Sequence, residues 1–88
     1  MVSSDWDAFK LHFDKIHPGF LERLSLQFPF LTAKEKRLCT YLRMNLTSKE
    51  IAGLANITVE SAEIARIRLR KKLNLARNQP LHSFLQQI

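Results

Sequence analysis

The chain has 88 residues, of which 45% are hydrophobic and 25% charged, and its formal net charge is +6. This length and composition indicate one small globular domain with a single hydrophobic core, and they exclude a chain that is disordered throughout. Cys39 is the only cysteine, so an intrachain disulfide is impossible and a secreted disulfide-rich protein is excluded. The sequence contains no apolar run of roughly 18 residues and no signal-peptide pattern, so we expect a cytoplasmic domain without membrane contact.

The positive charge is concentrated in the middle of the chain. Residues 1–31 have three basic and four acidic side chains, a net charge of −1, whereas residues 32–73 have ten basic and four acidic side chains, a net charge of +6. The remaining residues add only Arg77. A basic middle segment indicates an anionic partner, and nucleic acid is the leading candidate. A basic surface that only faces solvent is the alternative that charge alone leaves open.

Apolar residues recur at spacings of three and four near the start of the chain. They are Trp6, Phe9, Phe13 and Ile16. This pattern predicts an amphipathic helix that begins near Ser4 or Asp5. We expect its aromatic face to complete the core, because small domains need the burial. Attachment to an upstream domain and pairing with a second copy are the alternatives.

A second short helix is predicted in the stretch GFLERLSLQF. Pro18 is well suited to the first turn of this helix, and Pro29 ends it. Its apolar face consists of Phe20, Leu21, Leu24 and Phe28.

Three further helix starts follow. Thr32 with Glu35, and Thr47 with Glu50, form the Ser/Thr-x-x-Glu capping box, in which side chain and backbone satisfy each other's unpaired N–H groups. Thr58 is a third N-cap without the glutamate. The predicted helices span residues 33–44, 48–55 and 59–73.

The connection between the last two of these helices is a turn of Asn56, Ile57 and Thr58, in which Asn56 can take the left-handed conformation. A short helix, a tight turn and a longer basic helix are typical of a helix-turn-helix. Residues 80–88 have apolar side chains at helical spacing and predict a short helix that packs back on the body. We therefore expect an all-α bundle that contains a helix-turn-helix, with extra N-terminal helices and a short C-terminal helix.

The segment LTAKEKRLCTYLRMNLTSKEIAGLANITVESAEIARIRLRKKLNL resembles the LuxR/GerE-type helix-turn-helix, the C-terminal DNA-binding domain of many bacterial transcription regulators. The resemblance rests on Leu31-Thr32 with Glu35, on residues 46–52, on Ile57-Thr58 and on Lys72-Leu73. The flanking parts resemble a variant at the C-terminus of large Bacteroidetes regulators. Its features here are the aromatic helix, the step His17-Pro18-Gly19-Phe20 and the pair Phe84-Leu85. The implied domains are an N-terminal extension (1–31), the helix-turn-helix (32–75) and a C-terminal segment (76–88).

The segment also departs from the family pattern. The usual glycine before the Leu-Ser/Thr step is Asn45, which can take the same left-handed backbone. The usual Thr-Val-Lys at the start of the recognition helix is Ser61-Ala62-Glu63, and a later histidine is Ala65.

Helix 59–73 has two different faces at about 100° per residue. The core-facing stripe consists of Ala62, Ala65, Leu69 and Leu73. The opposite side carries Glu60, Ile64, Ile67, Arg68 and Lys71. Three explanations are open for the outward isoleucines: contact with thymine methyl groups, a protein interface, or burial under the N-terminal helices.

The resemblance implies which residues meet DNA. The base-facing positions correspond to Glu63, Ile64 and Ile67. Glu63 can accept a hydrogen bond from cytosine N4, although a plain surface charge or an intrahelical pair with Arg66 is equally ordinary. The expected phosphate-binding residues are Ser48, Lys49, Ser61, Arg68, Arg70, Lys71 and Lys72.

The expected function is sequence-specific binding of double-stranded DNA by the effector domain of a bacterial transcription regulator. Helix 59–73 would lie in the major groove, and the protein would act as a homodimer behind an upstream sensory domain. The alternative is a helical protein-interaction module that has kept the fold without base reading. We expect no enzyme, no cofactor and no metal, because His12, His17 and His82 form no ligand set. Cys39 is expected to be a buried small hydrophobe.

Overall fold

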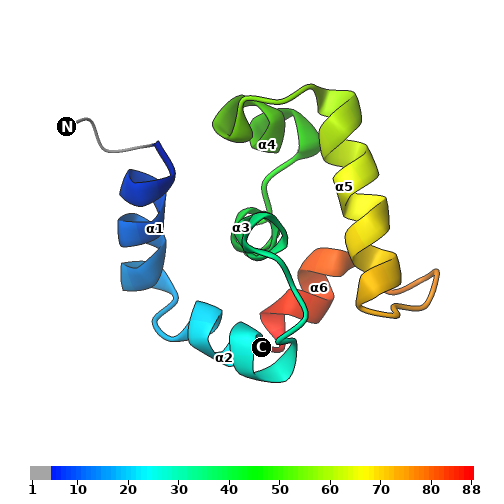
Figure 1. Ribbon diagram of the computed structural model, residues 1–88, viewed down its shortest axis with the longest axis horizontal. Coiled ribbons are helices and arrows are strands. Elements are labelled where there is room, and N and C mark those ends of the chain that lie inside the picture. Colours follow the sequence, from blue (N-terminus) through cyan, green and yellow to red (C-terminus); the bar gives the residue numbers. More distant parts are fainter. Residues whose placement is uncertain (1–4) are drawn as a thin grey trace.

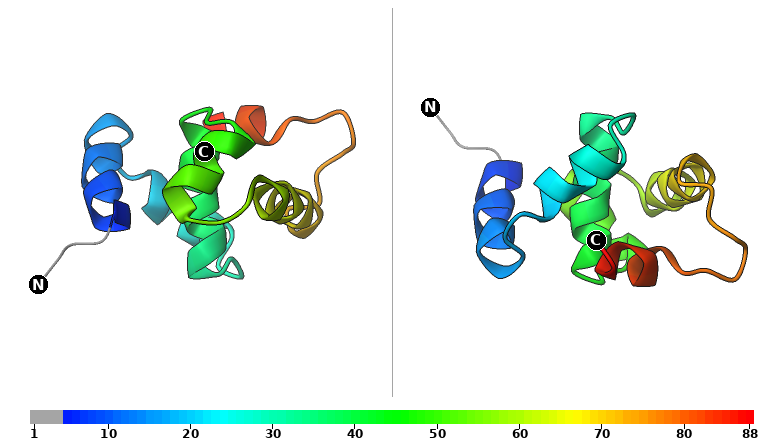
Figure 2. Two further views of the ribbon diagram at one scale, coloured as in Figure 1. Left: turned by 90° about the horizontal axis from the view of Figure 1, so that it is seen from above. Right: turned by 90° about the horizontal axis from the view of Figure 1, so that it is seen from below.

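The computed structural model describes residues 5–88 as an assembly of six helices around one central helix. The helices are α1 (Asp5–Ile16), α2 (Phe20–Gln27), α3 (Ala33–Arg43), α4 (Ser48–Ala55), α5 (Val59–Lys72) and α6 (Leu81–Gln86). Helix α3 lies in the middle and is seen end-on in Figure 1, with the other helices arranged around it. Figure 2 shows α1 on one side of this centre and α5 on the other. The predicted all-α bundle is confirmed.

The helix boundaries agree closely with those expected from the sequence. Helices α3, α4 and α5 differ from the predicted ranges by at most one residue at either end. Helix α1 begins at Asp5, while the alternative start at Ser4 lies outside the described residues. The expectation for Pro18 is wrong: α2 begins at Phe20, and its N-cap is Gly19 in a left-handed conformation with φ of 79°. Pro18 therefore lies in the turn between the helices, where glycine supplies the positive φ.

Both predicted capping boxes are present. The backbone N–H of Thr32 donates to Glu35 Oε1 over 2.8 Å, and the backbone N–H of Glu35 donates to Thr32 Oγ1 over 3.2 Å. The same reciprocal pair joins Thr47 and Glu50, at 2.9 and 3.1 Å. Thr58 Oγ1 accepts the backbone N–H of Ser61 at 3.0 Å. Helices α3, α4 and α5, the central unit of the fold, thus each have a threonine N-cap that satisfies an otherwise unpaired N–H donor.

The same three helices also end alike. Asn45, Asn56 and Asn74 have φ values of 59°, 57° and 56°, and they are the non-glycine residues with positive φ in the described chain. The apolar residue after each asparagine donates its backbone N–H to a carbonyl five residues earlier. These bonds run from Leu46 to Tyr41, from Ile57 to Ala52 and from Leu75 to Arg70, at 3.0 to 3.1 Å. This is the Schellman pattern of helix termination, and it satisfies carbonyls that the helix leaves unpaired.

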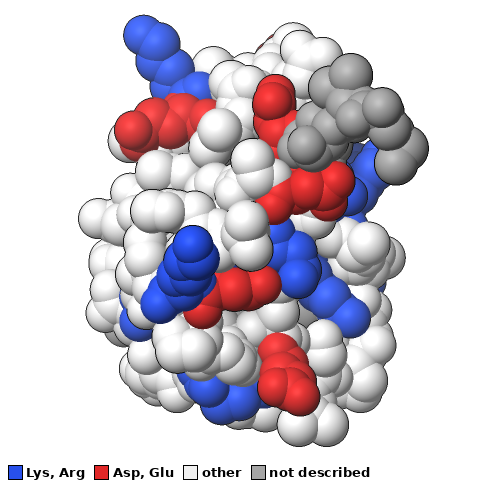
Figure 3. All heavy atoms as spheres, turned by 90° about the vertical axis from the view of Figure 1, so that its left-hand side faces the viewer, with Lys and Arg blue, Asp and Glu red and all other residues white. Residues whose placement is uncertain are grey.

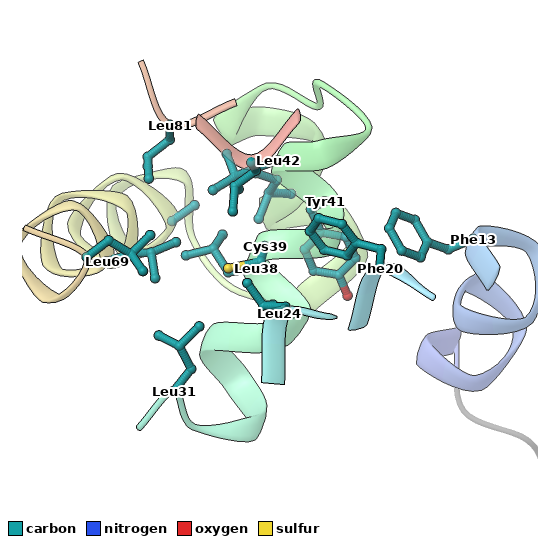
Figure 4. Packing of buried hydrophobic residues seen from close by; sticks show 14 of the residues in the cluster. Phe13, Phe20, Leu24, Leu31, Leu38, Cys39, Tyr41, Leu42, Leu69 and Leu81 are labelled. Carbon is teal, nitrogen blue, oxygen red and sulfur yellow. The ribbon is translucent and has the colours of Figure 1, made fainter. Parts of the chain in front are cut away.

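The core is built around α3 and includes side chains from α1, α2, α5 and α6. Figure 4 shows Leu38, Cys39 and Leu42 of α3 at its centre. Cys39 is fully buried, as expected, and burial raises the pKa of its thiol to about 12. The predicted C-terminal helix packs against α3 through Leu81 and Leu85, which are both buried.

Helix α1 contributes an aromatic layer to this core. Phe13 is fully buried, and its ring lies 5.4 Å from the ring of Phe20. The rings of Phe9 and Trp6 lie 5.0 and 6.1 Å from Tyr41 of α3, both edge to face. Edge-to-face packing at these distances is favourable beyond the burial alone. The expectation that the aromatic face of α1 completes the core is therefore confirmed.

The role of α1 in the core gives a stability prediction. Phe13→Ala should lower the free energy of unfolding by about 3 kcal/mol or more, because it removes a fully buried aromatic ring and leaves a cavity. Leu11→Ala in the same helix is the matched control, since Leu11 is 64% exposed and its loss should change stability by less than about 0.5 kcal/mol. Urea unfolding followed by circular dichroism measures both values, and equal effects would contradict the packing described.

Candidate nucleic-acid interface

The turn between α4 and α5 fixes how α5 is presented. Asn56 ends α4 with φ of 57° and ψ of 47°, and the backbone N–H of Ile57 donates to Ala52 O over 3.0 Å. Thr58 then caps α5. Helix α4 packs directly against α5, which lies on the outer side of the molecule in Figure 1. A tight turn between two packed helices therefore holds one side of α5 toward solvent.

The inner side of α5 is the predicted core stripe. Ala62 and Leu69 are fully buried, Leu73 is nearly so, and Ala65 is half-buried against the core. The prediction of this face is confirmed. The small alanine side chains allow α5 to approach its neighbours closely near its N-terminal end.

The outer side of α5 carries the expected base-facing residues. Ile64 is 45% exposed and Ile67 is 53% exposed, so of the three open explanations the one in which the N-terminal helices bury them is wrong. Helix α1 packs its aromatic side chains against Tyr41 of α3, and only its first residues approach this side of α5, without covering the two isoleucines. Glu63 is also exposed and forms no hydrogen bond or ion pair within residues 5–88, including none with Arg66. The three side chains present one acceptor and two branched aliphatic groups to solvent.

Some of the expected phosphate-binding residues are open to solvent. Lys49, Arg68 and Lys71 are exposed and form no ion pair within the described part of the chain. Ser48 is half-buried at the first position of α4. Ser61 is exposed in the first turn of α5, where its hydroxyl oxygen accepts from Thr58 Oγ1 over 2.9 Å. Within the described residues, three of these side chains are exposed cations without an ion pair.

Arg70 is engaged inside the chain. Its guanidinium donates to Gln79 O and Ala76 O, each over 2.6 Å, and to Arg77 O over 3.2 Å. These bonds hold the segment between α5 and α6 against α5. Charged donors that satisfy carbonyl groups are strong hydrogen-bonding partners. We therefore correct the expected phosphate-binding set by leaving Arg70 out of it.

Lys72 is also engaged, by a residue far away in the sequence. Its Nζ lies 2.7 Å from Glu35 Oε1, which also accepts the Thr32 backbone N–H in the capping box of α3. One carboxylate thus caps α3 and joins it to the C-terminal end of α5. Lys72 is thus paired within the chain while remaining partly exposed, so its expected role as a phosphate ligand would compete with this pair. Within the described residues, the expected phosphate-binding side chains that make no ion pair and no bond to a backbone carbonyl are Ser48, Lys49, Ser61, Arg68 and Lys71.

The opposite side of the molecule has a different charge pattern. Figure 3 shows the side on which α1 lies, where acidic and basic side chains are interspersed over a largely uncharged surface. Lys10 and Asp14 form an ion pair of 3.2 Å within α1. This side therefore offers an anion no continuous basic surface.

The sequence did not point to a groove of about 770 Å³ that borders α5. Its walls come from the start of α1, from α3, from the end of α4 and from α5, and Ser61, Ile64 and Arg68 lie along it. Lys49 and Lys71 lie outside it. Exposed apolar residues on both sides of the α4–α5 turn, Leu54 and Ile57, are the signal that could have suggested the groove.

Other kinds of site receive no support. Among residues 5–88, no three His, Cys, Asp or Glu side chains are grouped so that they could hold a metal ion. None of the helices described is long and apolar enough to cross a membrane. No family model, curated protein or solved structure matches this chain.

The Glu35–Lys72 pair makes stability depend on pH. Burial raises the pKa of Glu35, but hydrogen bonds from Lys72 and Thr32 outweigh it and lower the pKa below its ordinary value of 4.5. A lowered pKa means that the ionised carboxylate stabilises the fold above 4.5, and that this contribution is lost as the pH falls through the folded-state pKa. Glu35→Gln should therefore lower the free energy of unfolding near neutral pH by about 1 kcal/mol, and by less in acid.

The control is Glu22→Gln on the exposed side of α2, where no ion pair is lost within the described residues. Chemical unfolding of both variants at neutral and at acidic pH measures the effect. If Glu35→Gln lowered the free energy of unfolding equally at neutral and at acidic pH, a stabilising role for the ionised carboxylate would be contradicted.

Proposed function

We propose that this chain binds double-stranded DNA sequence-specifically, as the effector domain of a bacterial transcription regulator. The observation that carries the proposal is the outer side of α5. It is held toward solvent by a tight turn, and it combines cations that form no ion pair within residues 5–88 with exposed side chains that can contact base edges. The resemblance to the LuxR/GerE-type helix-turn-helix supports the same conclusion independently of the helix geometry. In this proposal α5 lies in the major groove and α4 lies against the DNA backbone.

The cations would hold the phosphates. Arg68 and Lys71 lie on the outer half of α5, and Lys49 with Ser48 lies at the N-terminal end of α4, where unpaired N–H groups attract anions. Ser61 adds a hydroxyl in the first turn of α5. Phosphate contacts of this kind set affinity and register but carry no sequence information.

Sequence preference would come from Glu63, Ile64 and Ile67. An exposed carboxylate can accept from cytosine N4, and an aliphatic side chain can contact the thymine methyl group. None of the three side chains is a hydrogen-bond donor, so purine N7 and O6 acceptors would find no partner on this edge. We therefore infer that guanine, which offers only acceptors in the major groove, is disfavoured on the strand that faces these residues.

Dimerisation on a two-part site and an upstream sensory domain complete the proposal. Both follow from the resemblance, because helix-turn-helix domains of this kind read paired half-sites about one helical turn apart. The second candidate is a helical protein-interaction module, which the exposed isoleucines and Glu63 favour.

The phosphate contacts can be tested by the salt dependence of DNA binding. A duplex should bind with an affinity that falls steeply as salt rises. Arg68→Gln and Lys71→Gln should each weaken binding to every sequence and reduce the salt slope by about 0.9. Lys15→Gln in the last turn of α1 is the matched control and should leave the slope unchanged. Absence of binding to any duplex at low salt would exclude the proposed function.

The assignment of Ile64 and Ile67 as base-facing residues can be tested by selecting bound duplexes from a random pool. Ile64→Ala and Ile67→Ala should relax the preference at one or two positions, which corresponds to roughly 1–3 kcal/mol of discrimination for each. Overall affinity should change less, because the cations remain. Leu26→Ala is the control, since Leu26 lies on α2 and is highly exposed. If the wild type and both isoleucine variants selected identical sequences, the assignment of Ile64 and Ile67 as base-facing residues would be wrong.

A further inference from the structure

The groove that borders α5 has an apolar floor. Its floor is formed by side chains of α3, α4, α5 and the turn. They are Leu38, Tyr41, Ile51, Leu54, Ile57 and Ile64. Leu54, Ile57 and Ile64 are 41, 43 and 45% exposed, so three exposed branched aliphatic side chains are gathered in one place. A gathered apolar surface with a polar rim marks an interaction site more often than isolated exposed residues do.

The rim of the groove is basic. Lys34 and Arg68 form no ion pair within residues 5–88, and the guanidinium of Arg37 lies 4.8 Å from the ring centre of Trp6. The acids on the rim are Asp5 and Glu35, and Glu35 is already neutralised by Lys72. The charge left for a partner to meet is therefore predominantly positive.

We propose that this groove binds an acidic amphipathic helix of a partner protein. The apolar floor fits the hydrophobic face of such a helix, and its acidic side chains would meet Lys34, Arg37 and Arg68. A nucleic-acid backbone would pair with the rim but would leave the floor without apolar contacts. A peptide that binds by adding a β-strand needs a sheet edge to pair with, and residues 5–88 contain no strand. The walls are all helices, which is the arrangement that a helix lying in a groove requires.

The location has a regulatory consequence, which rests on the proposed function. Ser61, Ile64 and Arg68 belong both to this groove and to the proposed DNA-binding side of α5. A helix that covers them occupies part of the surface that the duplex would need. The partner and DNA should therefore exclude each other, so the partner would act as an antagonist of DNA binding.

Trp6 provides a direct measurement, because it is the only tryptophan and it lines the groove. The probe is a short synthetic helix with leucines on one face and glutamates on the other. In the absence of DNA it should change the Trp6 emission in a saturable way, whereas the same peptide with lysines in place of the glutamates should not. No saturable change with the glutamate peptide would overturn the proposal, as would equal changes with both peptides.

Two groove variants test the location without touching residues assigned to DNA. Leu54→Glu and Lys34→Glu should each weaken binding of the glutamate peptide by about tenfold or more, because each puts a carboxylate where the groove is apolar or basic. The matched controls are Leu26→Glu on α2 and Lys15→Glu on α1, which lie outside the groove and should bind the peptide as wild type does. Circular dichroism confirms that all four fold.

The alternatives give different outcomes. If Leu54→Glu abolishes duplex binding in the same proportion as peptide binding, the groove is part of a nucleic-acid site and the proposal fails. If Leu54→Glu converts a dimer into a monomer in sedimentation while the peptide has no effect, a second copy occupies the groove and the proposal fails. Peptide binding without duplex binding would sustain the groove and reject the proposed DNA function. Duplex binding without peptide binding would sustain the proposed DNA function and reject the groove as a site for an acidic helix.

Discussion

The left-handed asparagine after each helix of the central unit is the constraint on which the rest of the structure depends. Asn45, Asn56 and Asn74 each reverse the backbone within one residue, and the apolar residue that follows is bonded back to the helix. A left-handed residue costs roughly 1–2 kcal/mol for most side chains, and asparagine reduces this cost. With a threonine cap at each start and this turn at each end, the directions of α3, α4 and α5 are fixed locally. The exposed side of α5 follows from those directions.

The basic residues in the C-terminal half of α5 fall into two groups with different roles. Arg70 and Lys72 satisfy carbonyl and carboxylate groups of the chain itself, whereas Arg68 and Lys71, which alternate with them along α5, face solvent. A helix can thus have a continuous run of positive charge in sequence and still offer only part of it to a partner. The engaged cations keep α5 tied to α3 and to the segment before α6, so the free ones are held on a rigid element.

Local patterns predicted most of the fold. The capping threonines, the spacing of Ala62 and Leu69, and the turn at Asn56 are encoded within a few residues, and the structure agrees with them. Contacts over long sequence distances were not predictable in this way. The pairing of Lys72 with Glu35 joins residues on two helices, and periodicity along α5 contains no information about α3. The groove was missed for the same reason, because four separate helices build it.

The buried thiol of Cys39 has a consequence for how the domain behaves in a changing chemical environment. A pKa of about 12 leaves almost no thiolate near neutral pH, and the surrounding side chains exclude oxidants and alkylating reagents. The thiol of Cys39 is therefore protected from oxidation and alkylation while the domain is folded. Because Cys39 lies in α3, at the centre of the core, it can react only when the central helix is uncovered. The rate at which Cys39 reacts with a thiol reagent therefore reports how often the core opens.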